Sequence, residues 1–146
     1  MSHTAVVKAI AIQSIAALNA AIAELNKTGV QCTLTPNATP RAYYSNQTGM
    51  GPADYVIGLK NSRYDIGLYK TDNGYEARTD FWGGDVEKVL GAAASSPEKR
   101  DQARMGKLFQ LYGVHAAMEE ARRKGLMARR QTGSDGKEQV IVTGYR

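Results

Sequence analysis

Two hydrophobic patterns follow one another in the first thirty residues. Residues 5–12 are rich in Val, Ile and Ala on both alternating faces, which is typical of a buried β-strand. Apolar residues then recur at intervals of three and four, the spacing of one buried helix face. They are Ile15, Leu18, Ile22 and Leu25. Ser14 can cap the start of this helix, and Gly29 can adopt the left-handed conformation that ends it.

Four short strands are predicted in the next fifty residues. They cover residues 30–34, 55–59, 64–69 and 75–80. We expect Pro36 and Pro40 to end the first of them, because proline cannot donate a ladder hydrogen bond. The sequence Asp72-Asn73-Gly74 predicts a hairpin between the last two, with the positive φ angles of a type I′ turn.

The second half of the chain predicts two helices and a hairpin. Asp85 can cap a short helix with Val86 and Leu90 inward, and Ser96-Pro97-Glu98 is a typical helix start. From there a long helix is expected to reach Lys124. Its predicted buried face consists of Met105, Leu108, Phe109, Tyr112 and Ala116. A closing hairpin follows over residues 126–131 and 138–143.

The predicted order is β-α-β-β-β-β-α-α-β-β. Strands and helices segregated in this way predict an α+β fold, an antiparallel sheet (a β-meander) with two main helices packed on it. A length of 146 residues predicts one domain over residues 1–146. The chain has one cysteine, Cys32, which excludes an internal disulfide. Polar residues interrupt the apolar N-terminal stretch, so we expect a cytoplasmic protein without a membrane segment.

The positive charge of the chain is concentrated in one segment. The net charge is +5, and residues 97–130 hold nine basic and four acidic residues, whereas the rest of the chain is balanced. On a helical projection Arg100, Arg104, Lys107 and Arg122 share one flank. A solvated surface with cations near a helix C-terminus explains residues 122–124 well but the row from Arg100 to Lys107 poorly. Contact with nucleic-acid phosphates is the alternative interpretation of this row. The predicted phosphate-binding residues are Arg41, Arg100, Arg104, Lys107, Arg122, Arg123, Lys124, Arg129 and Arg130.

The chain has eight tyrosines and two phenylalanines, which is a weaker indication of nucleic-acid binding than the charge. Tyrosine rings can stack on the bases of a single strand, although most tyrosines in strands simply pack on the sheet. The candidates for stacking are Tyr43, Tyr44, Tyr55, Tyr69 and Tyr145. We see no helix-turn-helix, zinc finger or basic zipper that would enter a major groove, so a single strand is favoured over a duplex.

Catalytic chemistry has little support in the sequence. His3, His115 and Cys32 lack the spacing of metal ligands, so no metal site and no cofactor are expected. Asp54 and Asp65 could converge with Asp80 as a magnesium site, or each could accept hydrogen bonds at a strand end. Because no nucleophile and base are recognisably paired, we expect a protein that is not an enzyme.

Several short segments occur in a characteristic order along the chain. They are Ala53-Asp54-Tyr55-Val56-Ile57, Tyr64-Asp65-Ile66-Gly67-Leu68, Gly74-Tyr75-Glu76, Asp80-Phe81-Trp82 and Gln110-Leu111-Tyr112. In this order the chain resembles an uncharacterised family of unknown function that includes a hypothetical chloroplast reading frame, cyanobacterial homologues and bacteriophage proteins. The resemblance covers nearly the whole chain, apart from an insertion around residues 91–104. It implies a compact cytoplasmic protein, often encoded by phage, and carries no activity.

The leading hypothesis is a non-enzymatic protein that binds single-stranded DNA or RNA and acts in phage replication or transcription. Its expected partners are single-stranded nucleic acid and a polymerase or another replication or transcription protein, and it could be a homo-oligomer. One alternative is an adaptor or inhibitor that presents its basic helix to an acidic surface of a host enzyme. A less favoured alternative is a metal-dependent nuclease.

Overall fold

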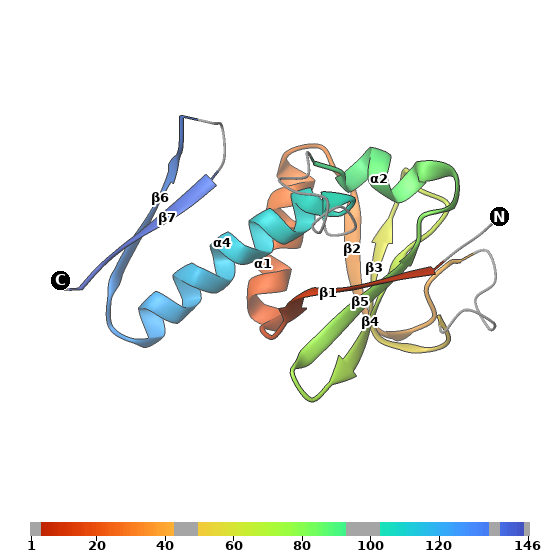
Figure 1. Ribbon diagram of the computed structural model, residues 1–146, viewed down its shortest axis with the longest axis horizontal. Helices are drawn as coiled ribbons and strands as arrows, with labels where there is room; N and C mark the ends of the chain where they lie inside the picture. The colour runs from red at the N-terminus through yellow and green to blue at the C-terminus, as the bar shows by residue number, and fades with distance from the viewer. Residues whose placement is uncertain (1–3, 43–49, 93–102, 135–137, 145–146) are drawn as a thin grey trace.

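The computed structural model describes residues 4–42, 50–92, 103–134 and 138–144 (Figure 1). Seven strands are described: β1 Thr4–Ile12, β2 Cys32–Ala38, β3 Ala53–Leu59, β4 Ile66–Thr71, β5 Gly74–Asp80, β6 Met127–Thr132 and β7 Glu138–Thr143. The described helices are α1 Ile15–Lys27, α2 Asp85–Leu90 and α4 Gly106–Arg123, with a 3-10 turn, η1, at Trp82–Gly84. The predicted α+β fold and its order of elements are confirmed.

Five strands form one antiparallel sheet in the order β1-β5-β4-β3-β2. The helices pack on one face of this sheet, and α1 and α4 lie against each other (Figure 1). The predicted helix faces supply much of the core, since Leu18 and Leu25 of α1 and Leu108 and Tyr112 of α4 are all buried. The sheet and the helix pair therefore share one hydrophobic layer.

Both predicted signals at the ends of α1 are confirmed. The Ser14 hydroxyl accepts a hydrogen bond from the backbone N–H of Ala17 at 3.0 Å. Gly29 has a φ of +97°, which a residue with a side chain rarely adopts, so the chain can turn away from the helix at this point.

Strand β2 differs from its prediction because it continues through Pro36 to Ala38. It is an edge strand, where a missing N–H on the free side costs no ladder hydrogen bond. At its other end the Asn26 side chain binds both backbone groups of Cys32, donating to the carbonyl at 2.8 Å and accepting from the N–H at 3.2 Å. The edge of β2 is thus capped by a side chain at one end and interrupted by proline at the other.

Two local predictions need correction. The β4–β5 hairpin is present, but positive φ occurs at Gly74 and not at Asn73, so the turn is not type I′. Asp85 is the first residue of α2 rather than its cap. Its carboxylate instead accepts hydrogen bonds from Arg63 at 2.8 and 3.1 Å, which lowers the pKa of Asp85 to about 2.

The predicted continuous helix from residue 97 to 124 is also wrong. Helix α4 begins at Gly106, after a turn at Arg104 and Met105. The cause is a close chain contact: the Ala92 N–H donates to the Ala103 carbonyl at 2.8 Å, and a Cβ on Gly106 would lie 2.6 Å from the Cβ of Ala92. The predicted helix start at residues 96–98 lies outside the described residues.

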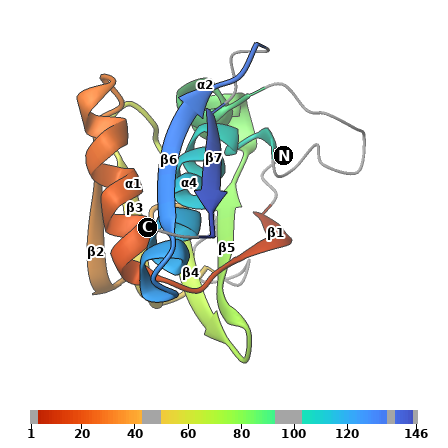
Figure 2. The ribbon, with the colours of Figure 1, turned by 90° about the vertical axis from the view of Figure 1, so that its left-hand side faces the viewer.

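The predicted closing hairpin is confirmed as β6 and β7, which form a separate two-stranded sheet. It lies at one end of the molecule, away from the five-stranded sheet, and both of its strands contact α4 (Figure 1). In Figure 2, β6 lies on the α1 side of the hairpin and β7 on the far side.

Candidate nucleic-acid interface

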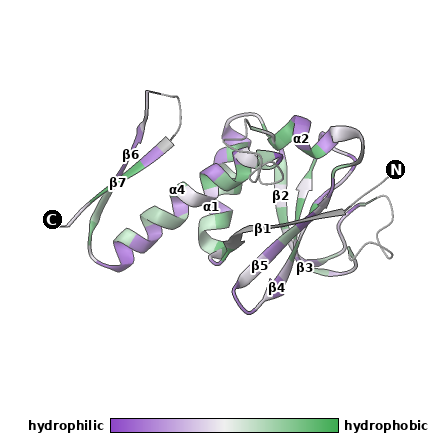
Figure 3. Cartoon of the chain, viewed as in Figure 1, coloured by the Kyte–Doolittle hydropathy of each residue, from purple (hydrophilic) through white to green (hydrophobic). Residues whose placement is uncertain are grey.

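Four of the predicted cations gather where α4 ends and the hairpin begins. They are Arg122, Arg123, Lys124 and Arg129, and all four are exposed; together we call them the basic end. The C-terminal part of α4 is correspondingly hydrophilic in Figure 3. Side chains alternate between the faces of a strand, so Arg129 lies on the face of β6 opposite to that of Arg130.

One carboxylate accompanies two of these cations. Glu120 forms ion pairs with Arg123 and, at 3.3 Å, with the Nζ of Lys124. The three side chains are 69%, 63% and 42% exposed for Arg123, Lys124 and Glu120. Exposed pairs of this kind contribute about 0–1 kcal/mol, so a phosphate can replace them at little cost. The basic end therefore keeps its positive character.

Arg130, in contrast, is part of the fold. Its guanidinium donates two hydrogen bonds to the Glu24 carboxylate of α1, at 2.8 and 3.0 Å. The Nε2 of His115, on α4, lies 2.8 Å from the same carboxylate. These contacts, with the Arg130 hydrogen bonds first, lower the pKa of Glu24 below its usual value despite partial burial. The cluster ties the hairpin to both helices, and sequence reasoning missed it because its members are far apart in the chain.

Arg104 and Arg41 also have structural partners. Arg104 lies 3.5 Å from a Glu87 carboxylate oxygen and stacks over the Phe81 ring at 4.9 Å. Arg41 binds the buried Asp65. The expectation that the cations follow one flank of a continuous helix is wrong because α4 begins at Gly106, so Arg104 lies before it. The carboxylates that bind Arg41, Arg130 and Arg104 are buried, partly buried and exposed, respectively.

The remaining predicted residues lie apart from the basic end or outside the described part of the chain. Lys107 is exposed, but the rise of α4 places it roughly 22 Å from Arg122 along the helix. Arg100, Tyr43, Tyr44 and Tyr145 lie outside the described residues.

The described tyrosines proposed for base stacking make other contacts. Tyr55 packs edge-on against Tyr75 with ring centroids 5.6 Å apart, next to the core. The Tyr69 hydroxyl donates to the Gly51 carbonyl at 2.9 Å, and Arg78 lies 4.6 Å over the Tyr69 ring. These rings serve packing, so among the described residues the support for nucleic-acid contact comes from charge rather than from stacking.

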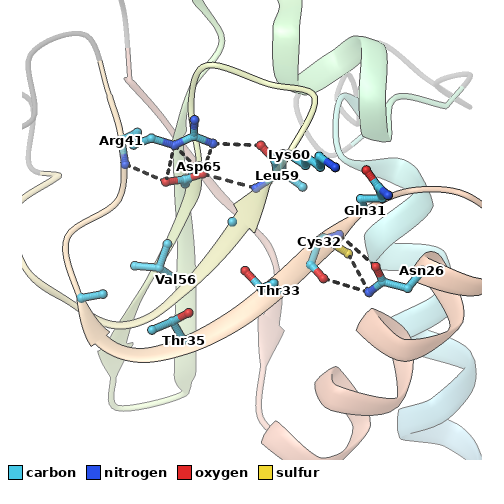
Figure 4. Close-up of a pocket in the computed structure, with 12 residues that line it drawn as sticks. Asn26, Gln31, Cys32, Thr33, Thr35, Arg41, Val56, Leu59, Lys60 and Asp65 are labelled. Carbon is cyan, nitrogen blue, oxygen red and sulfur yellow. Dashed lines mark hydrogen bonds and ion pairs between the residues drawn. The ribbon is translucent and has the colours of Figure 1, made fainter.

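An open hollow of about 550 Å³ lies on strands β2 and β3 (Figure 4). At one side the Arg41 guanidinium binds both oxygens of Asp65, with distances from 2.7 to 3.1 Å, and also the Leu59 carbonyl at 2.8 Å. Hydrogen bonding to Asp65 raises the pKa of Arg41. Lys60 and the hydroxyl of Thr33 are also part of the lining. Among the described residues that line the hollow, Asp65 is the one carboxylate, and its oxygens are engaged by Arg41 and the Leu59 N–H.

The carboxylates considered for magnesium do not form a site in the described part of the chain, where no group of three or more His, Cys, Asp or Glu could hold a metal. Asp54 accepts a hydrogen bond from the backbone N–H of Lys70 at 2.7 Å, and Asp65 is bound to Arg41. The Cys32 thiol is buried, which raises its pKa and makes it a poor nucleophile.

Comparison with known proteins defines the class to which this chain belongs. Residues 21–141 match the family described as "Protein of unknown function (DUF1257)", and the chain is a member of that family. No curated protein and no solved structure matches it. None of the described helices combines the length and apolar character that crossing a bilayer requires.

Proposed function

We propose that the protein binds single-stranded nucleic acid through the basic end, mainly by contacts to backbone phosphates. The observation that supports this proposal is that the fold holds some of the predicted cations beside carboxylates and leaves others exposed together. Arg41 and Arg130 are bound to a buried and a partly buried carboxylate, and the Arg104 side chain is itself mostly buried. The four cations of the basic end remain exposed at one extremity of the molecule, two of them beside the exposed Glu120.

The basic end suits a flexible strand better than a rigid duplex. Its cations surround the end of one helix and the first residues of a strand, so they do not form a long straight track. A single strand can bend around such a cluster and bring successive phosphates to each cation. No described helix stands free to enter a major groove, because both α1 and α4 are packed against the core.

Salt dependence gives the quantitative test. If the basic end neutralises up to four phosphates, the logarithm of affinity should fall with the logarithm of salt concentration with a slope of about −2 to −3. Fluorescence anisotropy with a labelled oligonucleotide at several salt concentrations measures this slope. Binding that ignores salt, or no binding at low salt, would overturn the proposal.

Substitutions locate the surface. Arg122→Ala and Arg129→Ala should each weaken binding and reduce the magnitude of the slope by about 0.7. Lys70→Ala, which removes an exposed cation from the five-stranded sheet, is the matched control and should leave the slope unchanged. Lys107→Ala should have a smaller effect than either basic-end variant because of its distance along α4. Equal effects for all four variants would indicate general attraction to a positive protein and would refute a defined site.

The resemblance to phage, cyanobacterial and chloroplast proteins supports the proposed setting. We place the protein in the cytoplasm, host cytoplasm where a phage encodes it, as a non-enzymatic factor in replication or transcription that works beside a polymerase. Affinity capture of partner proteins, with and without nuclease treatment of the lysate, tests whether the protein works beside a polymerase. A polymerase lost after nuclease treatment is the expected result, whereas a partner retained without nucleic acid would favour the protein adaptor instead.

A further inference from the structure

The edge of strand β7 is open in the described structure. The small sheet has the order β6-β7, so β7 has one neighbour. The hairpin is anchored on the β6 side, where Arg130 binds Glu24 of α1, and β7 lies on the far side (Figure 2). Packing against α4 stabilises this hairpin, as a two-stranded sheet requires. A further strand on β7 would pair the backbone N–H and C=O groups of its open edge.

The residues of β7 favour strand pairing. Gln139 to Thr143 contains no charge, no proline and no glycine, and Val140, Ile141 and Val142 are consecutive β-branched residues. Val142 is 47% exposed, and it and Met127 are the large hydrophobic residues that the described structure leaves exposed. Open strands of this composition are the ones that pair with other chains.

The other edges of the described sheets carry features that oppose pairing. The edge strand β1 contains the charged Lys8 and a register shift between Val7 and Ile12. In β2, Asn26 binds both backbone groups of Cys32 and Pro36 removes an N–H. In β6, Arg129 and Arg130 would face the same charges of a second β6 strand. Natural edge strands use such prolines, caps and charges against pairing, and β7 between Gln139 and Thr143 has none of them. The contrast singles out β7.

We propose that two copies of the chain pair through β7, antiparallel and about a two-fold axis, to form a four-stranded sheet β6-β7-β7-β6. Pairing of β7 with itself closes after two copies, since each strand satisfies the other. Pairing of β7 with a different edge, such as that of β1, would leave a free edge on each copy and produce open chains. This proposal is independent of nucleic-acid binding, although it would bring two basic ends onto one sheet and so raise avidity.

Symmetry makes the pairing testable at the level of single residues. Directly opposite residues of an antiparallel pair point to the same face, so a two-fold axis requires one residue of β7 to face its own copy. Facing Cα atoms lie within the range that a disulfide spans. Single cysteines at positions 139 to 143 should therefore give one strong cross-linked position under mild oxidation, with weak cross-linking beside it. The parent chain, with its buried Cys32, is the control for background oxidation.

Sedimentation velocity of the full chain over a range of concentrations gives the second measurement. We expect a mass twice the 15.8 kDa of one chain, and at least a tenfold weaker self-association for Val142→Lys. Gln131→Lys places the same charge at an exposed site of β6 and should leave the dimer intact. Circular dichroism of both variants verifies that they fold. A monomer at every concentration, a Val142→Lys variant that dimerises normally, or uniform cross-linking at all five positions would overturn the proposal. Salt-dependent oligonucleotide binding by a monomer would overturn this proposal alone.

Discussion

Arg129 and Arg130 are adjacent in β6 but lie on opposite faces of the hairpin, so they form a matched pair for separating folding from ligand binding. Replacing each with Gln removes one positive charge and keeps a similar side-chain length. We expect Arg130→Gln to destabilise the hairpin and to leave the salt dependence of oligonucleotide binding nearly unchanged in magnitude. We expect Arg129→Gln to leave the stability of the hairpin unchanged and to reduce the salt dependence of oligonucleotide binding.

The size of the Arg130 effect follows from its contacts. Two charged hydrogen bonds of 2.8 and 3.0 Å join its guanidinium to Glu24, and the two side chains are 29% and 24% exposed. Fully exposed ion pairs contribute about 0–1 kcal/mol, and breaking a buried pair costs about 3–5 kcal/mol. Partial burial places Arg130→Gln between these limits, at about 1–2 kcal/mol. An exposed substitution such as Arg129→Gln should stay within about 0.5 kcal/mol of the parent.

Hydrogen exchange of the β6 and β7 amides is the suitable assay, because the hairpin can open locally without unfolding of the five-stranded sheet. Arg130→Gln should speed exchange in the hairpin about fivefold to thirtyfold, the factor that corresponds to 1–2 kcal/mol. Equal exchange rates in the two variants would contradict the structural role of Arg130. If Arg130→Gln lost oligonucleotide binding while hydrogen exchange in the hairpin stayed unchanged, Arg130 would be a ligand-binding residue rather than a structural one.

Three further predictions concern the stability of the fold. The pKa of Glu24 is lowered in the folded protein, so its contribution is present above pH 4.5, its usual value, and disappears as pH falls through the lower folded value; the stability difference between the parent and Glu24→Gln in urea should shrink over that interval, and a difference constant with pH would contradict this. Tyr112→Phe should cost about 1–3 kcal/mol in urea denaturation, because the hydroxyl accepts hydrogen bonds of 2.8 and 3.1 Å from two backbone N–H groups at the start of α1; unchanged stability would refute this role. Gly74→Ala should lower the melting temperature, since φ is +126° and the new Cβ would lie 2.6 Å from the Ile12 carbonyl oxygen, whereas Gly51→Ala meets no atom within 4 Å and is the control that should melt like the parent.

Local patterns predicted the secondary structure well where the relevant physics is local. The cap at Ser14, the left-handed Gly29 and the three- and four-residue spacing in α1 act within one or two helical turns, so the sequence contains all the information they need. The positions of the hairpin before Gly74 and of the closing hairpin were predicted for the same reason, although the type of the first turn and the cap of α2 were predicted wrongly. Errors arose at Pro36 and Gly106, where a neighbouring strand or a close contact with Ala92 determines what the backbone can do.

The candidate site also separates what the sequence determines from what the tertiary structure determines. The sequence by itself determined that residues 97–130 hold the excess positive charge, because charge is a sum over residues and needs no geometry. Only the tertiary structure decided which cations remain exposed: Arg130 meets Glu24 across more than a hundred residues, while Arg129 beside it lies on the other face of the strand. Ion pairs form between groups that folding brings within a few ångströms, and a linear pattern contains no such distances.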